Sequence, residues 1–197
     1  GLGLVVENCR HLELLNELNQ VPVTFGAVDR RKLPKRWWPP LIVESQGRTN
    51  SCGGHASALA SSHANYVQTG EVVRFSRRFA YVTAQSVGGF LGRDGGTSIE
   101  SLIRAQTQFG DCLEVDDPFT EWYNPHWTEE AARHAAKHKH RGDVPYDLRD
   151  FDQAVEWLTD KRRILIGTLW RTGQDACQGI EDRKVGTSGQ RRGYHAR

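Results

Sequence analysis

Methionine and long apolar runs are both missing from this sequence. None of the 197 residues is Met and the chain starts at Gly1, so we expect a processed or truncated product. No apolar run approaches the roughly 18 residues of a membrane span, and the first residues lack the charged-then-apolar order of a signal peptide. The sequence therefore predicts a soluble globular chain without a membrane span. It leaves the compartment open, with a secreted or particle-associated protein among the alternatives.

Net charge and closely spaced cysteines are also scarce. With 26 basic and 24 acidic residues the formal net charge is +2, which argues against a nucleic-acid partner held through its phosphates. The four cysteines, at positions 9, 52, 112 and 177, are too widely spaced for a disulfide scaffold, and no Cys-x-x-Cys occurs. A zinc ribbon or a redox dithiol is therefore disfavoured. A bridge from Cys112 to either Cys9 or Cys177 stays open.

The first 26 residues are predicted to form a helical N-terminal extension. Leu12, Leu15 and Leu18 recur at near-helical spacing and the pattern ends before Pro22, since proline cannot continue a helix interior. We favour an ordinary packed helix here. A remnant of a pro-segment and an arm that docks on a protein partner are the alternatives.

The most specific stretch is a polar, glycine-punctuated loop that runs into an Ala-rich segment, with Cys52 at the junction. Helical spacing over residues 52 to about 68 predicts a helix with one buried face, formed by Ala56, Leu59, Ala60, Ala64 and Val67. Cys52 then lies in the first turn, where unpaired amides and the helix dipole favour the nucleophilic thiolate. Gln46 could add a side-chain N–H beside the Cys52 amide for a developing oxyanion. The alternative is a buried, inert cysteine.

This stretch resembles the papain family of cysteine peptidases. In that family a Gln-Gly pair opens the loop and the nucleophilic Cys follows six residues after the Gln, as Gln46, Gly47 and Cys52 do here. Thr49 stands where the family usually has a second Cys, which removes a usual disulfide, and Gly53 stands where it has an aromatic residue. Runs similar to family motifs follow at residues 75–81, 109–112 and 117–119, so the likeness covers about 170 of the 197 residues.

Two helices are predicted after the central one. Ser76 is a good N-cap for a helix with Phe79 and Val82 on one face, and Gly88-Gly89 ends that helix. Thr97 and Glu100 form a capping box for the next helix, whose inner stripe is predicted to be Ile99, Leu102, Ile103 and Gln106.

Gly95 and Gly96 lie directly before the second of these helices. Backbone without side chains can lie against an extended peptide and exchange main-chain hydrogen bonds with it. As a bare dipeptide the pair would be a turn. The resemblance implies that Gly95 and Gly96 bind the substrate backbone.

Residues 128–141 are predicted to form a polar helix with Thr128 as N-cap. His134 and His138 are four residues apart and share a face, and His140 follows, which raises the possibility of a metal site. No carboxylate or third ligand is suitably placed, so we favour a solvated insertion helix and predict no metal.

A second, β-rich part is predicted after this helix. Residues 164–170 have the apolar content of a buried strand. Gly193-Tyr194-His195-Ala196 resembles the family's Gly-x-His-Ala, in which a His on a strand faces the nucleophile across the cleft. The resemblance therefore implies that His195 is the catalytic partner of Cys52. The family orients this His with an Asn further on, for which the chain has no residue after His195, so a truncated second lobe is one expectation.

These signals predict an α+β protein with a papain-like two-lobe fold. Residues 1–26 form the extension and residues 27–197 the peptidase domain, in which about 27–125 form the helical lobe. The insertion helix and an antiparallel β lobe then occupy about 126–197.

The resemblance implies a cysteine peptidase that acts on a peptide or protein substrate and needs no cofactor. Its catalytic residues would be Cys52, His195 and Gln46, and its substrate-binding residues Gly95 and Gly96. Two other classes stay open. One is an impaired scaffold or binding protein that keeps the fold, and the other is a cysteine-dependent amidase or transferase.

Overall fold

The computed structural model describes residues 44–140, Val155, Leu158, Leu165 and the backbone of residues 167–171 and 191–196. The predicted extension over residues 1–26 lies outside this part. The described elements are, in order, α2 (Cys52–Thr69), α3 (Arg77–Gly88), α4 (Ile99–Gln108), α5 (Glu129–Ala135), the 3₁₀ turn η2 (Ala136–His138), β1 (Gly167–Arg171) and β2 (Arg191–Ala196). None of the described helices is both long and apolar enough to cross a bilayer.

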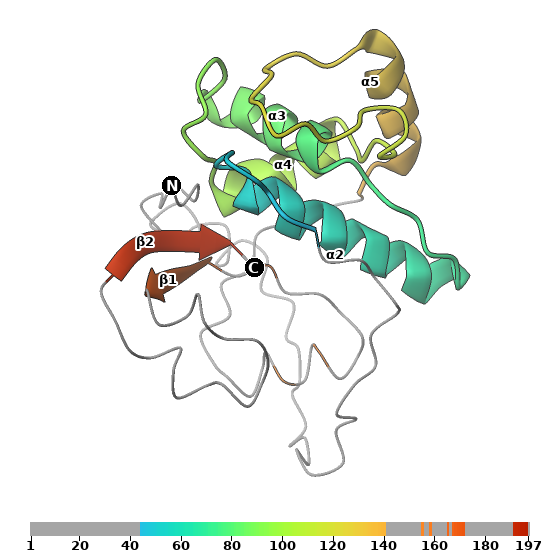
Figure 1. Cartoon of the computed structure of the whole chain (residues 1–197). Coiled ribbons are helices and arrows are strands. Elements are labelled where there is room, and N and C mark those ends of the chain that lie inside the picture. The colour runs from blue at the N-terminus through green and yellow to red at the C-terminus, as the bar shows by residue number, and fades with distance from the viewer. Residues whose placement is uncertain are drawn as a thin grey trace, which may run out of the picture.

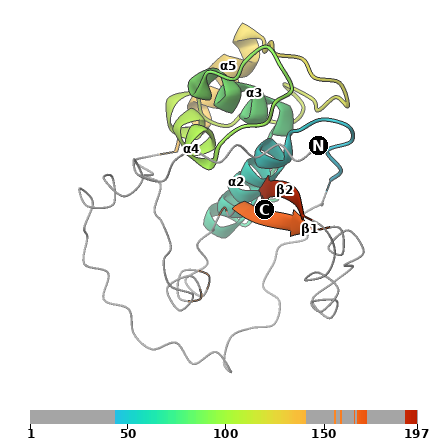
Figure 2. The ribbon, with the colours of Figure 1, turned by 90° about the vertical axis from the view of Figure 1, so that its left-hand side faces the viewer.

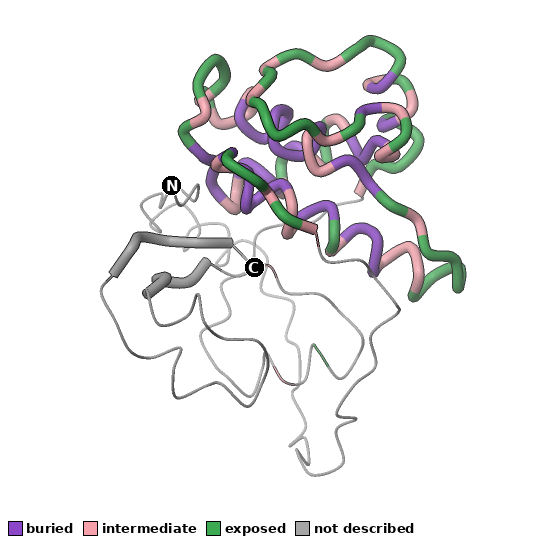
Figure 3. Tube along the Cα trace, viewed as in Figure 1, coloured by how far each residue is buried: buried purple, intermediate pink, exposed green. Residues whose placement is uncertain are grey.

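Helix α3 is the centre of the helical lobe. Both α2 and α4 pack against α3. Strand β2, which lies near the end of the sequence, is beside α2 (Figures 1 and 2). The buried segments gather where these helices face one another (Figure 3). This arrangement places the start of α2 between a helical layer and a strand.

The helix predicted from Cys52 is confirmed as α2, but its predicted buried face is wrong. Leu59 is 38% and Val67 44% exposed. Apart from Cys52 and His63, the buried positions are small residues, namely Gly53, Gly54, Ser57, Ala58, Ser61 and Ser62. A Cβ at Gly54 would lie 2.5 Å from the Arg77 carbonyl oxygen, so this face is selected for close approach to α3 rather than for apolar area.

Two of the three serines on this face, Ser61 and Ser62, have hydroxyls with local partners, whereas the buried Ser57 hydroxyl has no partner among the described residues. Ser62 donates to the Ala58 carbonyl at 2.9 Å and Ser61 to the Ser57 carbonyl at 3.3 Å. A buried hydroxyl that returns to the helix backbone avoids the cost of an unpaired polar group.

Helix α3 follows its predicted signals. The Ser76 hydroxyl accepts from the Phe79 amide at 2.9 Å, and Gly89 ends the helix in the left-handed conformation, with φ +73°. Phe79 and Val82 are both fully buried, as predicted. Phe79 packs with Cys112, Ala131 and Ala135 in one core cluster.

Helix α4 begins one residue later than the capping box predicts. Ser98 is the N-cap, and its hydroxyl accepts from the Ser101 amide at 3.1 Å. Thr97 is fully buried, and its methyl group lies 3.0 Å from the position of a Cβ at Gly53. Packing against α2 therefore takes Thr97 out of the capping role. Leu102 is the one member of the predicted inner stripe that is buried. The other buried residues of α4 are Ser101 and Ala105, which were not predicted.

The insertion helix α5 is capped as predicted, since the Thr128 hydroxyl accepts from the Ala131 amide at 3.1 Å. It is not simply solvated, because Ala131 and Ala135 are fully buried against Phe79 and Cys112. Their small side chains let α5 close the core on that side. The solvated-helix prediction is correct only for the outer face.

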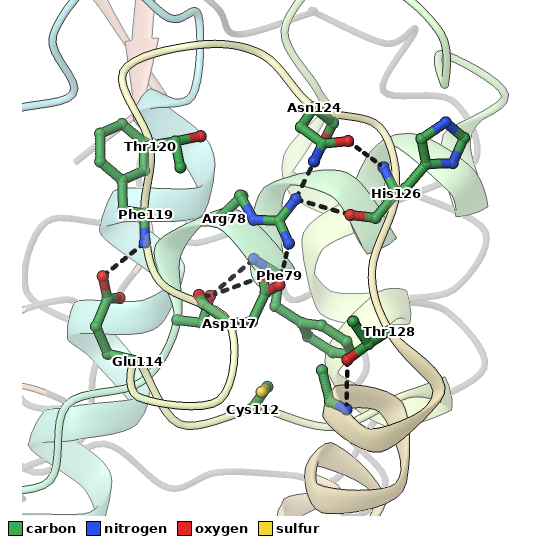
Figure 4. A network of polar contacts seen from close by, with 12 residues as sticks. Arg78, Phe79, Cys112, Glu114, Asp117, Phe119, Thr120, Asn124, His126 and Thr128 are labelled. Carbon is green, nitrogen blue, oxygen red and sulfur yellow. Dashed lines mark hydrogen bonds and ion pairs between the residues drawn. The ribbon is translucent and has the colours of Figure 1, made fainter.

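The loop that leads to α5 is tied to the start of α3 by Arg78 (Figure 4). Ser76 adds a second tie. The Arg78 guanidinium pairs with Asp117 and donates to the His126 carbonyl at 2.7 Å. The Ser76 hydroxyl donates to the Asp117 carbonyl at 2.6 Å. Because Ser76 also caps α3, helix and loop share one polar junction.

Strands β1 and β2 pair antiparallel, with Thr168 opposite His195 and an irregularity between Trp170 and Arg171. The predicted strand over residues 164–170 is thus found as Gly167–Arg171, and His195 lies on a strand. Leu165 packs against the buried cluster of Ala84, Leu102 and Ala105. Helices and this antiparallel pair make the described part α+β, while the rest of the predicted β lobe lies outside the described residues.

Candidate active site

The loop before α2 is a tight turn closed at both ends by Gln46 and Thr49. The Thr49 amide and hydroxyl donate to the Gln46 carbonyl at 3.2 and 2.8 Å. The Gln46 side-chain Nε2 donates to the Thr49 carbonyl at 2.8 Å, and Gly47 has φ +56°, which glycine adopts without strain. A side-chain amide has two N–H donors, and the second Gln46 donor has no acceptor among the described residues.

The N-terminus of α2 has no side-chain cap. Ser51 is the N-cap residue but makes no capping hydrogen bond. Its hydroxyl lies 2.6 Å from the Thr49 hydroxyl and 3.2 Å from His55 Nδ1 instead. Cys52 is the first residue of the helix and is 2% exposed. The first backbone amides of α2 are therefore left without a side-chain acceptor among the described residues.

His55 lies one turn further along α2 and was not assigned a function from the sequence. Its Nδ1 lies 3.0 Å from the Ser51 carbonyl oxygen. Its ring packs edge-on against the Phe119 ring, with 4.8 Å between the ring centroids. Burial lowers the pKa of His55. Nε2 is buried without a partner among the described residues, so a neutral ring with its hydrogen on Nδ1 fits these surroundings.

The two glycines of the predicted substrate loop differ in their surroundings. Gly95 is exposed, and its amide donates to the Arg93 carbonyl at 2.8 Å. Gly96 is buried with φ +89°. Its amide donates to the Tyr81 hydroxyl and its carbonyl accepts from Gln85 Nε2, both at 3.0 Å. Of the two glycines, Gly95 is therefore the one that lies at the surface.

His195 lies in β2, the strand beside α2. The structure thus brings the strand that carries His195 next to the helix that carries Cys52 (Figure 2). Gln46, Cys52, Gly95 and Gly96 all belong to the helical lobe.

The three histidines of the insertion have separate partners. His134 Nδ1 lies 2.9 Å from Asp116, and His140 Nε2 lies 2.7 Å from Asp111. His138 packs edge-on against Phe75 at 5.4 Å. Within residues 44–140 and the other described positions, no group of three metal-ligating side chains gathers.

Cys112 is a free, buried thiol, so neither of the bridges left open for it is present. Burial, with a smaller contribution from the nearby Asp117, raises the pKa of Cys112 to about 12. A thiol with this pKa is almost wholly protonated at neutral pH and is a poor nucleophile.

A helical lobe built on a Cys-bearing helix, with an antiparallel strand pair beside it, defines a papain-like fold. Among solved structures, xylellain, a cysteine protease from Xylella fastidiosa, is similar over 100% of this chain and 77% of its own, with a TM-score of 0.73 and 17% identity. Digestive procathepsin L 3 from the larval midgut of Tenebrio molitor is similar over 82% of this chain and 53% of its own, with a TM-score of 0.52 and 16% identity.

These likenesses establish the papain-like cysteine peptidase fold and thereby confirm the resemblance in fold. No protein-family model matches the chain. No curated protein sequence matches it either.

Proposed function

We propose that this chain is a cysteine peptidase that hydrolyses peptide bonds through a thioester acyl-enzyme. The observation that carries the proposal is Cys52 at the uncapped start of α2 in a papain-like fold. An uncapped helix N-terminus favours both a thiolate and the oxyanion that forms when the thiolate attacks a carbonyl.

In this mechanism the Cys52 thiolate forms a bond to the peptide carbonyl carbon. The carbonyl electrons move to the oxygen, which accepts from the Cys52 amide and from the second N–H of Gln46. His195, as imidazolium, gives its proton to the amine as the C–N bond breaks, which leaves a thioester on Cys52. His195 then removes a proton from water, which attacks the thioester carbonyl. The C–S bond breaks, and the acid is released with Cys52 again a thiolate and His195 again an imidazolium.

Gly95 would contact the substrate backbone in this scheme. It is exposed, and a Cβ there would meet only the flexible Arg93 side chain, at 3.5 Å. An extended peptide can therefore approach the loop closely. Gly96 fixes the backbone next to Gly95 through its hydrogen bonds to Tyr81 and Gln85.

The test is hydrolysis of a peptide library by the wild type and by Cys52→Ala and His195→Ala. We expect each variant to lose activity on the order of 10³-fold or more, as removal of a catalytic nucleophile or base does. Cys112→Ala and His126→Ala are the matched controls, since they remove a protonated thiol and an exposed imidazole. Both controls should keep normal activity if they fold.

Absence of any peptide hydrolysis by the wild type would overturn the proposal. Binding of a peptide without cleavage would then favour the scaffold class. Cleavage of non-protein amides, dependent on Cys52, would favour the amidase or transferase class.

A further inference from the structure

The nucleophile loop and the Gly95–Gly96 loop meet at Asp94. The Asn50 backbone amide donates to both carboxylate oxygens of Asp94, at 3.0 and 2.9 Å. The Asn50 side chain donates to the Asp94 carbonyl at 2.7 Å. Asn50 lies two residues before Cys52, and Asp94 lies directly before Gly95. Three hydrogen bonds thus join two loops that are 44 residues apart.

The other side of Asp94 is anchored on α3 by Tyr81. The Tyr81 hydroxyl donates to Asp94 Oδ1 at 2.7 Å. It accepts from the Gly96 amide and from Gln85 Nε2, both at 3.0 Å. Burial and the neighbouring Asp94 raise the pKa of Tyr81, so its hydroxyl keeps the hydrogen that it donates. The donor and both lone pairs of this hydroxyl are therefore all in use.

Gln85 extends the same network to the outer part of the loop. Gln85 is fully buried, and its Nε2 lies 3.0 Å from the Arg93 carbonyl as well as from the Gly96 carbonyl and the Tyr81 hydroxyl. Its two hydrogens are therefore shared among three acceptors. Its Oε1 accepts from the Tyr123 hydroxyl at 2.7 Å, and the same hydroxyl accepts from the Gly92 amide at 3.0 Å. One turn of α3, through Tyr81 and Gln85, thus holds the backbone of residues 92–96.

We infer that Asp94 is a positioning residue that sets the place of Cys52 relative to the substrate-binding Gly95. This inference rests on the proposed peptidase function. Hydrogen bonds to a carboxylate are shorter and stronger than those between neutral groups, and α3 is the buried centre of the lobe. The carboxylate therefore ties both loops to one rigid base, so that an acyl group held on Gly95 lies in reach of the sulfur.

The test compares Asp94→Asn and Tyr81→Phe with the control Asp116→Asn. Asp116 is a carboxylate of the same lobe that lies beside His134 and outside the network. Steady-state rates are divided by the number of Cys52 thiols that a tight-binding reagent titrates to completion. A variant that is only partly folded has fewer titratable thiols but a normal rate per thiol, whereas a misplaced thiol is titrated in full and turns over slowly.

We expect kcat per titrated thiol to fall in Asp94→Asn by about 10- to 100-fold, the cost of misplacing reacting groups by about 1 Å, and less in Tyr81→Phe. Asp116→Asn should be unchanged. Amide hydrogen exchange gives a readout that does not need activity, because the Asn50 and Gly96 amides should exchange faster in both network variants and not in the control.

Equal rates per thiol in Asp94→Asn and Asp116→Asn, or unchanged exchange at both amides, would overturn the inference. If the wild type cleaves no peptide, the proposed function fails separately. In that case the inference is tested by the alkylation rate of Cys52 in folded Asp94→Asn, compared with that of the wild type. A changed rate supports the inference, because the hydrogen bonds of Asp94 would then position the sulfur. An unchanged rate overturns it.

Discussion

Cys52 and Cys112 are both buried thiols, but their electrostatic surroundings differ. Cys52 begins a helix whose first amides have no side-chain cap, whereas Cys112 lies in an apolar core with Asp117 nearby. The pKa of Cys112 is raised by burial first and by Asp117 second, and neither the apolar cluster nor this carboxylate surrounds the start of α2.

We predict that a small alkylating reagent modifies Cys52 in the folded protein at neutral pH and that Cys112 reacts only on unfolding. Peptide mapping after limited alkylation, with and without urea, measures both rates. The assignment of Cys52 as nucleophile is wrong if Cys112 reacts first in the folded state.

Gln46 is predicted to act only when charge develops on the substrate oxygen. Gln46→Ala should lower kcat by roughly 10- to 1000-fold, the range for a lost oxyanion donor, and change KM little. Gln68→Ala, an exposed change near the end of α2, is the control in the same kinetic assay. Equal kcat values for the two variants would remove Gln46 from the site.

His55 predicts a specific pH dependence of stability. Its pKa in the folded state is below the ordinary value of about 6.5, so the unfolded chain binds a proton more readily. Above pH 6.5 neither state is protonated at this ring. As pH falls below 6.5, the unfolded state takes up the proton and stability drops, until the folded pKa is reached.

Urea unfolding at pH 7.5 and 5.5 measures this effect. His55→Asn, whose side-chain amide can still donate to the Ser51 carbonyl, should lose less stability between the two pH values than the wild type. His126→Asn, at an exposed site, should behave as the wild type. An unchanged pH slope in His55→Asn would contradict the prediction.

At the scale of the elements, the contact between α2 and α3 depends on Gly54. Alanine is the better helix former by about 1 kcal/mol. However, a Cβ at Gly54 would lie 2.5 Å from the Arg77 carbonyl oxygen and 2.6 Å from Tyr81 Cβ. These atoms cannot turn away without moving α3, so the clash outweighs the propensity.

We predict that Gly54→Ala destabilises the protein by about 1–3 kcal/mol, the usual cost of overpacking. Gly95→Ala is the control, because that position is open. Denaturant midpoints at constant m-value measure the difference. A higher denaturant midpoint for Gly54→Ala than for the wild type would contradict the prediction, because α3 would then accommodate the Cβ without loss of stability.

At the scale of the whole molecule, the helix with Cys52 and the strand with His195 come from distant parts of the chain and lie side by side. A ligand that adds to Cys52 binds the folded state alone and must therefore stabilise it. The proposed function predicts that a peptide aldehyde is such a ligand, since a thiol adds across an aldehyde carbonyl to form a hemithioacetal.

We expect such an aldehyde, at about 100 times its Kd, to add about 2.7 kcal/mol and to raise the Tm by roughly 5–10 °C. The matching peptide alcohol and the Cys52→Ala variant are the controls in a thermal scan. A Tm shift that persists in Cys52→Ala would show binding elsewhere.

Local signals in the sequence determined both ends of α3 and the start of α5. Ser76, Gly89 and Thr128 act where they were predicted to act, because a cap bonds to amides or carbonyls within about four residues. The helix at Cys52 and the strand at His195 were likewise predicted, and the loop pattern around Gln46 already indicated the papain-like fold. These features depend on neighbours in the sequence or on a short motif.

The tertiary structure alone decided which surfaces meet. Packing against Gly53 moved the cap of α4 from Thr97 to Ser98, and close approach to α3 buried serines in place of Leu59. The bonds from Asp94 to Asn50 and Tyr81 join loops that no periodicity connects. A residue's partner across the fold depends on shape and hydrogen-bond geometry between distant segments, which the spacing of residues along one chain does not encode.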